Sequence, residues 1–292
     1  GEVSCQGLED HYKYCSDSRK EFNMAIPFVL PLIEINTWSP RKMKKDIWAV
    51  YETLQEDGWW ARFLSNHDKP RQVSLYGDDK AYWKESAKLL GTIIDLLPGT
   101  PFIFQGEEIG MTDVDYTSIS DFRDIDTFNV YNVDIANGKS EEEAFQGAKR
   151  VSRDNARSPM QWTDGVHAGF STAEPWMAVN KNHTTINVLE EEKDPDSILN
   201  YYRALLTLRS ENTTLRRGSL SFIDMESTWS FSYRRRLGDE EFVILSNFSK
   251  EEQILDFDTS SYTLLLSNYG RKEVATKKIL FKPYEVMVLK KN

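Results

Sequence analysis

Cysteine, positive charge and long apolar runs are all scarce in this sequence of 292 residues. The two cysteines, Cys5 and Cys15, are too few for a disulfide framework or a cysteine zinc site. Lys and Arg number 36 against 46 Asp and Glu, and the net charge of −10 argues against a nucleic-acid partner, whose phosphates need cations. No apolar run approaches the ~20 residues that cross a bilayer. We therefore expect no nucleic-acid partner and no membrane partner.

Aromatic residues, by contrast, are abundant. The chain holds 8 Trp, 13 Tyr and 15 Phe, while its hydrophobic share of 40% and charged share of 28% are ordinary for a globular protein. Aromatic side chains fill large cores, and they also stack against flat sugar rings. The length is sufficient for one large domain or for two smaller ones with a buried core.

The first hundred residues alternate short apolar runs with longer helical patterns. Strands are predicted at 22–28, 61–65 and 101–104, and helices at 42–54 and 79–97. Strands and helices that alternate in this way indicate an α/β fold in which helices cover a parallel sheet.

The pattern changes twice further along the chain. Residues 105–195 are long, polar and irregular, and we expect a loop or subdomain with a functional role and a helix near 140–149. A strong helical pattern then runs from about residue 196 to 209, and alternating apolar residues follow. Such alternation indicates a small antiparallel β-sandwich, so we predict two domains, 1–213 and 214–292. Strands of the sandwich are expected at 229–233, 241–245, 262–266, 278–281 and 285–289.

Polar side chains after the predicted strands are the first candidates for chemistry. Asn66, His67 and Asp68 directly follow the strand at 61–65, and the functional side chains of α/β barrels gather at the carboxyl ends of strands. A histidine at that position can donate to one sugar hydroxyl, while the neighbouring carboxylate accepts from another. The simpler interpretation of this triplet is a strand-end cap with a solvated Asp.

Two further segments combine charges with glycine or aromatic residues. Glu107 and Glu108 stand between glycines after the strand at 101–104, and we favour a tight turn in which these acids bond the backbone. Arg153 and Arg157 precede Trp162. A planar guanidinium suits carboxylates and vicinal hydroxyls, although surface ion pairing is the default role of a single arginine.

Three long motifs resemble the α-amylase superfamily of glycoside hydrolases, in particular its branch of oligo-1,6-glucosidases and other α-glucosidases. They are Ala61-Arg-Phe-Leu-Ser-Asn-His-Asp-Lys-Pro-Arg-Gln-Val-Ser74, Gly99-Thr-Pro-Phe-Ile-Phe-Gln-Gly-Glu-Glu-Ile-Gly-Met-Thr112 and Arg153-Asp-Asn-Ala-Arg-Ser-Pro-Met-Gln-Trp162. The resemblance covers nearly the whole chain. It implies that residues 1–213 are the second half of a (β/α)8 TIM barrel, strands five to eight, and that 214–292 are a C-terminal antiparallel β-sandwich.

The resemblance further implies a retaining, cytoplasmic α-glucosidase that releases glucose from short α-1,6- or α-1,4-linked oligosaccharides. The nucleophile of this family is an Asp at the end of strand four, and no position of this chain matches it. Because retaining hydrolysis needs a nucleophile beside a general acid, we expect the isolated chain to be inactive. We also expect the open sheet edges of half a barrel to be covered by the missing N-terminal half or by self-association.

By the same match, Glu2 corresponds to the general acid and Asp68 to the carboxylate that stabilises the transition state. His67 and Arg153 correspond to side chains that contact the glucose. Phe28 is a further substrate-binding candidate, but its surroundings lack the acid and the histidine that the family often has there, so the linkage preference stays open. No metal and no cofactor are expected, because the family's calcium loop belongs to the part without a match.

Other functions of this superfamily also stay open. A trehalose-6-phosphate hydrolase would need cations near the leaving sugar, for which Lys69 is the candidate, and a sucrose isomerase would use the same active site. A non-catalytic scaffold, as in the heavy chains of amino-acid transporters, can lose its catalytic carboxylates. The presence of both Glu2 and Asp68 favours an enzyme.

Overall fold

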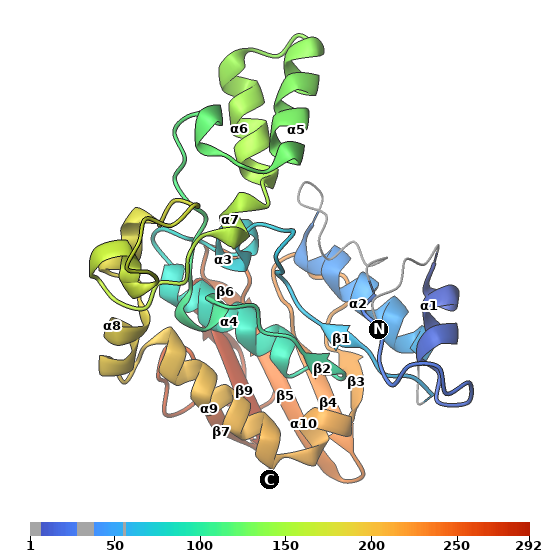
Figure 1. The fold of residues 1–292 in the computed structure, drawn as a ribbon. Coiled ribbons are helices and arrows are strands. Elements are labelled where there is room, and N and C mark those ends of the chain that lie inside the picture. Colours follow the sequence, from blue (N-terminus) through green and yellow to red (C-terminus); the bar gives the residue numbers. More distant parts are fainter. Residues whose placement is uncertain (1–6, 28–37, 55–56) are drawn as a thin grey trace. The chain divides into compact units, whose positions relative to one another are not determined.

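The computed structural model describes residues 7–27, 38–54 and 57–292, with the elements labelled in Figure 1. The helices are α1 (Leu8–Cys15), α2 (Pro40–Leu54), α3 (Gln72–Tyr76), α4 (Trp83–Asp95), α5 (Ile125–Ala136), α6 (Glu141–Val151), α7 (Asp154–Arg157), α8 (Val188–Lys193), α9 (Ile198–Glu211) and α10 (Thr213–Arg217). The strands are β1 (Ala61–Arg62), β2 (Thr100–Pro101), β3 (Ser219–Phe222), β4 (Tyr233–Leu237), β5 (Glu240–Ser246), β6 (Gln253–Leu255), β7 (Tyr262–Ser267), β8 (Ile279–Phe281) and β9 (Val286–Lys291).

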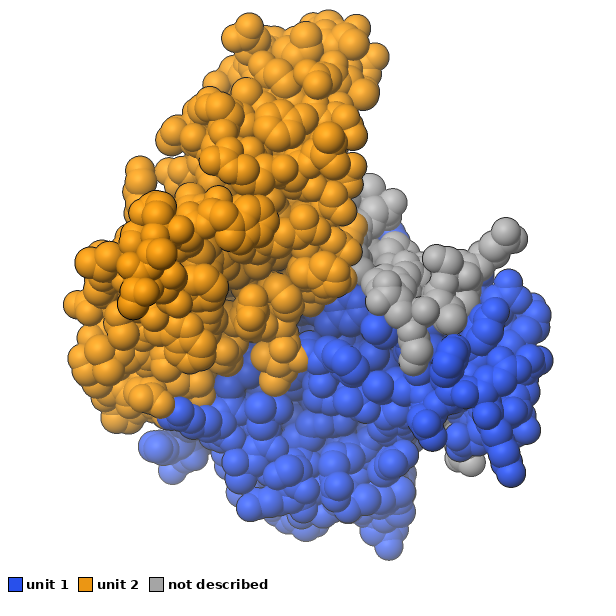
Figure 2. Space-filling model, in the orientation of Figure 1, with its two compact units in different colours: residues 1–64, 88–102, 201–292 blue, residues 65–87, 103–200 orange. Residues whose placement is uncertain are grey.

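The chain divides into two compact units, coloured separately in Figure 2. The first unit comprises residues 1–64, 88–102 and 201–292, and the second comprises 65–87 and 103–200. Among the described residues, no helix combines the length and the apolar character that crossing a membrane requires.

A short parallel sheet lies in the first unit. β1 pairs with β2 in parallel, with Ala61 opposite Thr100, and Ala25 forms a parallel bridge to Trp60. The three segments predicted to be consecutive strands therefore run side by side in one direction, as an α/β fold requires. Both named strands are shorter than predicted, and the half barrel as a whole stays a prediction.

Two of the predicted helices are confirmed as α2 and α4. α2 begins at Pro40, a residue favoured at the first helical position because that amide needs no helical partner. Its buried side chains include Ile47, Val50 and Leu54, which lie on one face at the spacing of a helix. The chain leaves α4 through Gly99, whose φ of 101° favours glycine.

The C-terminal strands form the predicted β-sandwich within the first unit. The larger antiparallel sheet has the order β3-β4-β5-β9-β7, and a smaller sheet pairs β6 with β8. Both sheets contribute to one apolar core, which contains Val243, Leu245, Phe257, Ile279, Phe281, Met287 and Leu289. β4 begins later than predicted, because the N–H of Phe231 donates to the side-chain hydroxyl of Ser246 in β5 and not to a backbone carbonyl of that strand. The sequence pattern did not indicate β3 or β6.

Buried arginines join the segment after α4 to the sandwich, also within the first unit. Arg209 of α9 donates to the carbonyl oxygens of Leu97 at 3.1 Å and Gly99 at 2.7 Å. Arg235 of β4 donates to the carbonyl oxygen of Leu96. The last carbonyls of a helix have no helical donor, and cations there also complement the negative end of the helix dipole. The guanidinium groups therefore hold this end of α4 in place.

The same cluster contains a buried carboxylate, Asp95, and a further guanidinium, Arg62. Arg62 donates to Gly99 O at 3.0 Å. Among the described residues, its Nε and Nη1 have no hydrogen-bond partner, and neither has Oδ2 of Asp95. Burial raises the pKa of Asp95 to about 7, although the charges of Arg62 and Arg209 act in the opposite direction. For the guanidinium of Arg62, burial acts in the opposite direction and lowers the pKa, because it disfavours the charged form.

The segment after β2 is more regular than predicted, and it belongs to the second unit. The expected helix is α6, which begins with a capping box between Ser140 and Glu143. A further helix, α5, lies beside it (Figure 1) and was missed by the sequence pattern. The reason is that Ile125, Val133 and Ile135 of α5 are exposed, so its apolar residues do not form one buried face.

Replacing Asp95 with Asn tests the buried carboxylate through the pH dependence of stability. Between its ordinary pKa of 3.8 and its folded value of about 7, Asp95 binds a proton in the native chain and not in the unfolded chain. This group therefore makes the wild type less stable as pH rises through that window. Asp95→Asn should remove the effect, so its stability relative to wild type should rise by roughly 2–4 kcal/mol from pH 4 to pH 7.5 in urea unfolding.

The exposed Asp239→Asn variant is the matched control, and its stability should stay within about 0.5 kcal/mol of wild type. If the curves of Asp95→Asn and wild type run parallel over this range, Asp95 is ionised in the folded chain and the prediction is wrong.

Candidate functional site

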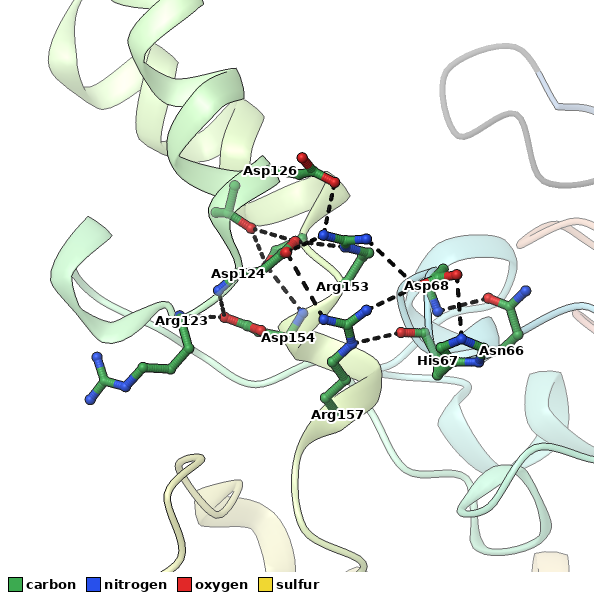
Figure 3. A network of polar contacts seen from close by, with 11 residues as sticks. Asn66, His67, Asp68, Arg123, Asp124, Asp126, Arg153, Asp154 and Arg157 are labelled. Carbon is green, nitrogen blue, oxygen red and sulfur yellow. Dashed lines mark hydrogen bonds and ion pairs between the residues drawn. The ribbon is translucent and has the colours of Figure 1, made fainter.

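The turn after β1 carries the predicted pair His67 and Asp68 (Figure 3). Oδ1 of Asn66 accepts the backbone N–H of Asp68 at 2.9 Å and so closes an Asx turn. Nε2 of His67 lies 3.5 Å from Oδ2 of Asp68, and the two side chains are 68% and 45% exposed. Both groups are therefore accessible to a ligand.

Two guanidinium groups face Asp68 (Figure 3). Nη2 of Arg157 donates to Oδ1 of Asp68 at 2.8 Å, and Nε of the same residue donates to the carbonyl oxygen of His67 at 2.9 Å. Nη1 of Arg153 lies 3.8 Å from the same carboxylate oxygen. Arg153 and Arg157 are one helical turn apart, a spacing that brings their side chains to one side of α7.

Arg153 is held by two more carboxylates, which lie at the start of α5. Its Nε donates to Oδ2 of Asp124 at 2.9 Å, its Nη2 donates to the other oxygen of that residue, and Nη2 lies 2.8 Å from Oδ2 of Asp126. Burial raises the pKa of Asp124, but the hydrogen bond and the charge of Arg153 outweigh it and bring the pKa below its ordinary value. The hydrogen bond from Arg153 to Asp124 raises the pKa of the guanidinium in turn.

Asp154 connects α7 to the beginning of α5. Its Oδ2 accepts the backbone N–H groups of Arg123 at 2.6 Å and Asp124 at 3.0 Å. The guanidinium of Arg123 points away from the network in Figure 3, so this residue contributes its backbone alone to that contact. The side chain of Asp154 thus fixes the segment of Asp124 to the segment of Arg153.

Buried Arg71 joins several loops of the second unit. Its Nε donates to Asn155 O at 3.2 Å and its Nη2 to Ser158 O at 3.4 Å, while Nη1 donates to Gln105 O. The backbone N–H of Arg71 donates to Oδ1 of Asp113 at 2.7 Å. Burial lowers the pKa of Arg71 to about 10 and raises that of Asp113 to about 7. Because two of these carbonyls lie in and just after α7, Arg71 positions this short helix.

The paired acids Glu107 and Glu108 have structural partners, in agreement with the interpretation favoured from the sequence. Gly106 and Gly110 have φ values of 95° and 63°, which glycine adopts without strain. The N–H of Gly106 donates to Oε2 of Glu108 at 2.7 Å, and Ser65 Oγ donates to Glu107. Glu108 therefore stabilises its own turn, and Glu107 binds the end of the segment that follows β1.

The structure brings together His67, Asp68 and Arg153, whereas Glu2 and Phe28 lie outside the described residues. In the described part of the chain, no group of three or more His, Cys, Asp or Glu side chains is placed to hold a metal ion.

Sequence reasoning did not assign roles to Arg157 or Asp124. A signal existed for Arg157, which stands one helical turn after Arg153 in the same motif. No signal existed for Asp124, because its contact with Arg153 joins segments that are distant in sequence.

Chemically, the cluster is suited to a ligand with several hydroxyl groups. The half-exposed carboxylate of Asp68 accepts hydrogen bonds, and the imidazole of His67 lies beside it. The planar forks of Arg153 and Arg157 donate, and they match vicinal oxygens well. A polyhydroxylated ligand can exchange hydrogen bonds with all these groups.

Comparison with known proteins places this site in a family. Residues 1–218 match the model of the α-amylase catalytic domain, and the chain therefore belongs to the α-amylase family of glycoside hydrolases. Enzymes of this family have a TIM barrel followed by a C-terminal β-sheet region.

Among individual proteins, the chain is 38% identical to an oligo-1,6-glucosidase of Bacillus cereus over an alignment 303 residues long, which covers 99% of the chain and 54% of that protein. It is 41% identical to a glucan 1,6-alpha-glucosidase of Streptococcus pneumoniae over 238 residues, which is 81% of the chain and 44% of the relative. The chain thus spans about half the length of the curated relatives it matches.

Solved structures give the same picture. A trehalose-6-phosphate hydrolase of Bacillus licheniformis superposes with a TM-score of 0.92 at 35% identity, covering 99% of this chain and 55% of that one. An isomaltulose synthase of Klebsiella sp. superposes with a TM-score of 0.93 at 29% identity, covering 100% of this chain and 55% of that one.

Replacing Arg71 with Leu tests the role of the buried guanidinium. Several buried carbonyls would lose their donor, so we expect the free energy of unfolding in urea to fall by roughly 3–5 kcal/mol. The matched control is Arg123→Leu, whose guanidinium donates to two carbonyl oxygens near the surface. It should cost less than about 1 kcal/mol. Equal losses for the two variants would contradict the assigned role of Arg71.

Proposed function

We propose that this chain is part of a retaining α-glucosidase that releases glucose from short α-1,6- or α-1,4-linked oligosaccharides in the cytoplasm. The observation that carries the proposal is the accessible carboxylate of Asp68 in a chain of the α-amylase family. The imidazole of His67 lies beside this carboxylate, and the guanidinium groups of Arg153 and Arg157 face it. The oligo-1,6-glucosidase and glucan 1,6-alpha-glucosidase relatives support a glucose unit as the substrate.

Asp68 accepts hydrogen bonds from the hydroxyl groups of the glucose that is cleaved off, and its charge stabilises the oxocarbenium-like transition state. His67 and Arg153 bind the same sugar, and Phe28 is a further candidate for substrate binding. Glu2 protonates the glycosidic oxygen as the bond breaks. A carboxylate from outside these 292 residues attacks the sugar, and water releases the glucose with Glu2 acting as base.

Within this scheme the arginines act by orientation. Arg157 holds both Oδ1 of Asp68 and the backbone of His67, which keeps the carboxylate at a fixed place in the turn. Arg153 is shared with the carboxylates of Asp124 and Asp126, so it is positioned before any sugar arrives. Such preorganisation reduces the cost of ordering the site during the reaction.

The purified 292-residue chain should release no glucose from isomaltose or maltose, because the attacking carboxylate is supplied from elsewhere. A protein extended upstream from the same gene to the length of the relatives should release glucose from at least one of them. The measurement is glucose release in a coupled assay. Turnover by a preparation free of any longer form would overturn the proposal that the nucleophile lies outside the chain.

Glu2→Gln and Asp68→Asn in the extended protein separate the two catalytic roles. Glu2→Gln should lose most activity on isomaltose, whose leaving group needs a proton, and retain activity on an activated aryl glucoside, whose leaving group does not. Asp68→Asn should lose activity on both substrates. Glu9→Gln and Asp239→Asn, both at exposed positions, are the controls. Equal losses of Glu2→Gln on both substrates would contradict its role as the acid.

The similarity to an isomaltulose synthase and to a trehalose-6-phosphate hydrolase supplies alternative substrates for the same site. Incubating the extended protein with sucrose and with trehalose 6-phosphate, followed by product chromatography, separates them. An isomer of sucrose as the main product would favour an isomerase. Absence of turnover with every substrate would favour the scaffold function.

A further inference from the structure

The first unit contains a pocket of about 730 Å³ formed by residues that precede β1 and β2, together with the beginning of β3 and the end of β4. A volume of this size accommodates a small organic ligand. Its polar and aromatic lining includes Trp59, Arg217, Arg236, Asp17, Asn23 and Ser219. None of these side chains belongs to the network around Asp68.

The fold brings the two arginines together. Arg217 ends α10, and Ser219 of β3 lies opposite Arg236 of β4 in the antiparallel ladder. Between them, Gly218 permits a close approach of the two segments, since an added Cβ would lie 2.9 Å from the carbonyl oxygen of Arg236. Both guanidinium groups therefore line one pocket by virtue of strand pairing.

Trp59 holds Arg217 and does not serve as an open stacking surface. The guanidinium carbon of Arg217 lies 4.3 Å from the centroid of the indole, and Nε1 of the indole donates to Oγ1 of Thr100 at 2.8 Å. The indole is thus fixed at its edge and covered by a cation on a face. This arrangement orients the guanidinium toward a ligand and leaves less of the ring for stacking against a neutral sugar.

The charges of the pocket favour an anion. Neither Arg217 nor Arg236 has a carboxylate partner in an ion pair among the described residues, and Nε of Arg236 donates to Gly238 O at 3.0 Å. Asp17 is the acid among the lining residues, so the pocket has an excess of positive charge in a chain whose net charge is −10. Guanidinium groups without a carboxylate are well suited to phosphate, which they bind through paired hydrogen bonds.

The remaining lining groups suit a hydroxylated body. The carboxylate of Asp17 accepts hydrogen bonds from hydroxyl groups, and the amide of Asn23 both donates and accepts. The hydroxyl of Ser219 donates to Arg236 O at 3.1 Å and keeps its capacity to accept. We propose that this pocket binds a small phosphorylated sugar, with the phosphate on Arg217 and Arg236 and the hydroxyl groups on Asp17 and Asn23.

Isothermal titration of the 292-residue chain with glucose 6-phosphate, glucose and inorganic phosphate tests the proposal. Glucose 6-phosphate should bind at least about tenfold more tightly than inorganic phosphate and at least about tenfold more tightly than glucose. Binding should also change the tryptophan fluorescence, because Arg217 lies on the ring of Trp59. If glucose binds as well as its phosphate, or inorganic phosphate binds as tightly, the pocket does not recognise a sugar phosphate and the proposal fails.

Substitutions locate the binding. Arg217→Gln with Arg236→Gln should weaken glucose 6-phosphate binding at least about tenfold, while Arg216→Gln, an exposed neighbour outside the lining, should change it less than about twofold. Asp17→Asn should reduce the preference for glucose 6-phosphate over inorganic phosphate. Circular dichroism establishes that each variant is folded. If a variant does not fold, the comparison of the three ligands on the unsubstituted chain still tests the proposal.

The result is independent of the proposed glucosidase activity, because no turnover is measured. Asp68→Asn should leave the affinity for glucose 6-phosphate within about twofold of wild type. A loss of binding in Asp68→Asn, with none in the double arginine variant, would place the ligand at the candidate glycosidase site and overturn the proposal.

Discussion

Buried backbone carbonyls must find hydrogen-bond donors, and this chain supplies many of them from the guanidinium groups of buried arginines. In the first unit, Arg209 and Arg235 satisfy carbonyls at and after the end of α4. In the second unit, Arg71 satisfies carbonyls in and just after α7 and the carbonyl of Gln105. A guanidinium has several N–H groups in one rigid plane, so a single side chain can bind carbonyls from separate segments. Burial lowers the pKa of Arg71 and of Arg235 to about 10, so both stay charged at neutral pH.

The same residue type behaves differently near the surface. Arg153 and Arg157 are paired with carboxylates, and the side chain of Asp68 between them is 45% exposed. Ion pairs in contact with water contribute little free energy, so a hydroxyl group of a ligand can replace part of such a pair at small cost. Asp124 is different, because it is 3% exposed and its bond to Arg153 is protected from solvent. The site therefore combines a protected pair of Arg153 and Asp124 with the solvent-accessible carboxylate of Asp68, an arrangement suited to binding polar ligands.

The family and the geometry together explain why the candidate glycosidase site and the proposed sugar-phosphate pocket are compatible in one chain. In TIM-barrel enzymes, the loops at the carboxyl ends of the strands carry the chemistry, and His67 and Asp68 follow β1 in this way. Residues that precede the strands lie at the opposite ends and do not have to supply catalytic groups. In the first unit, Trp59 precedes β1 and supports Arg217, with Asp17 as the acid of the same pocket. The positive character of this pocket comes from strand pairing, which places Arg236 beside the end of α10.

Local patterns in the sequence were sufficient for the elements whose burial follows a simple period. The apolar face of α2 was predicted because it is buried at the helical period, and the strands of the sandwich were predicted from their short apolar runs, although β5 and β9 bury consecutive residues. The motif at 66–68 and Arg153 were also identifiable, through strand-end placement and resemblance to the α-amylase superfamily.

Tertiary structure alone decided the rest. α5 exposes apolar residues and so lacks a period that reports burial. The partners of Arg71, the bond between Asp124 and Arg153, and the stacking of Arg217 on Trp59 join residues that are distant along the chain. Local periodicity records which face of an element is buried, whereas the partner of a charged side chain depends on how separate segments pack. For this reason the elements could be derived from the sequence, but their polar connections could not.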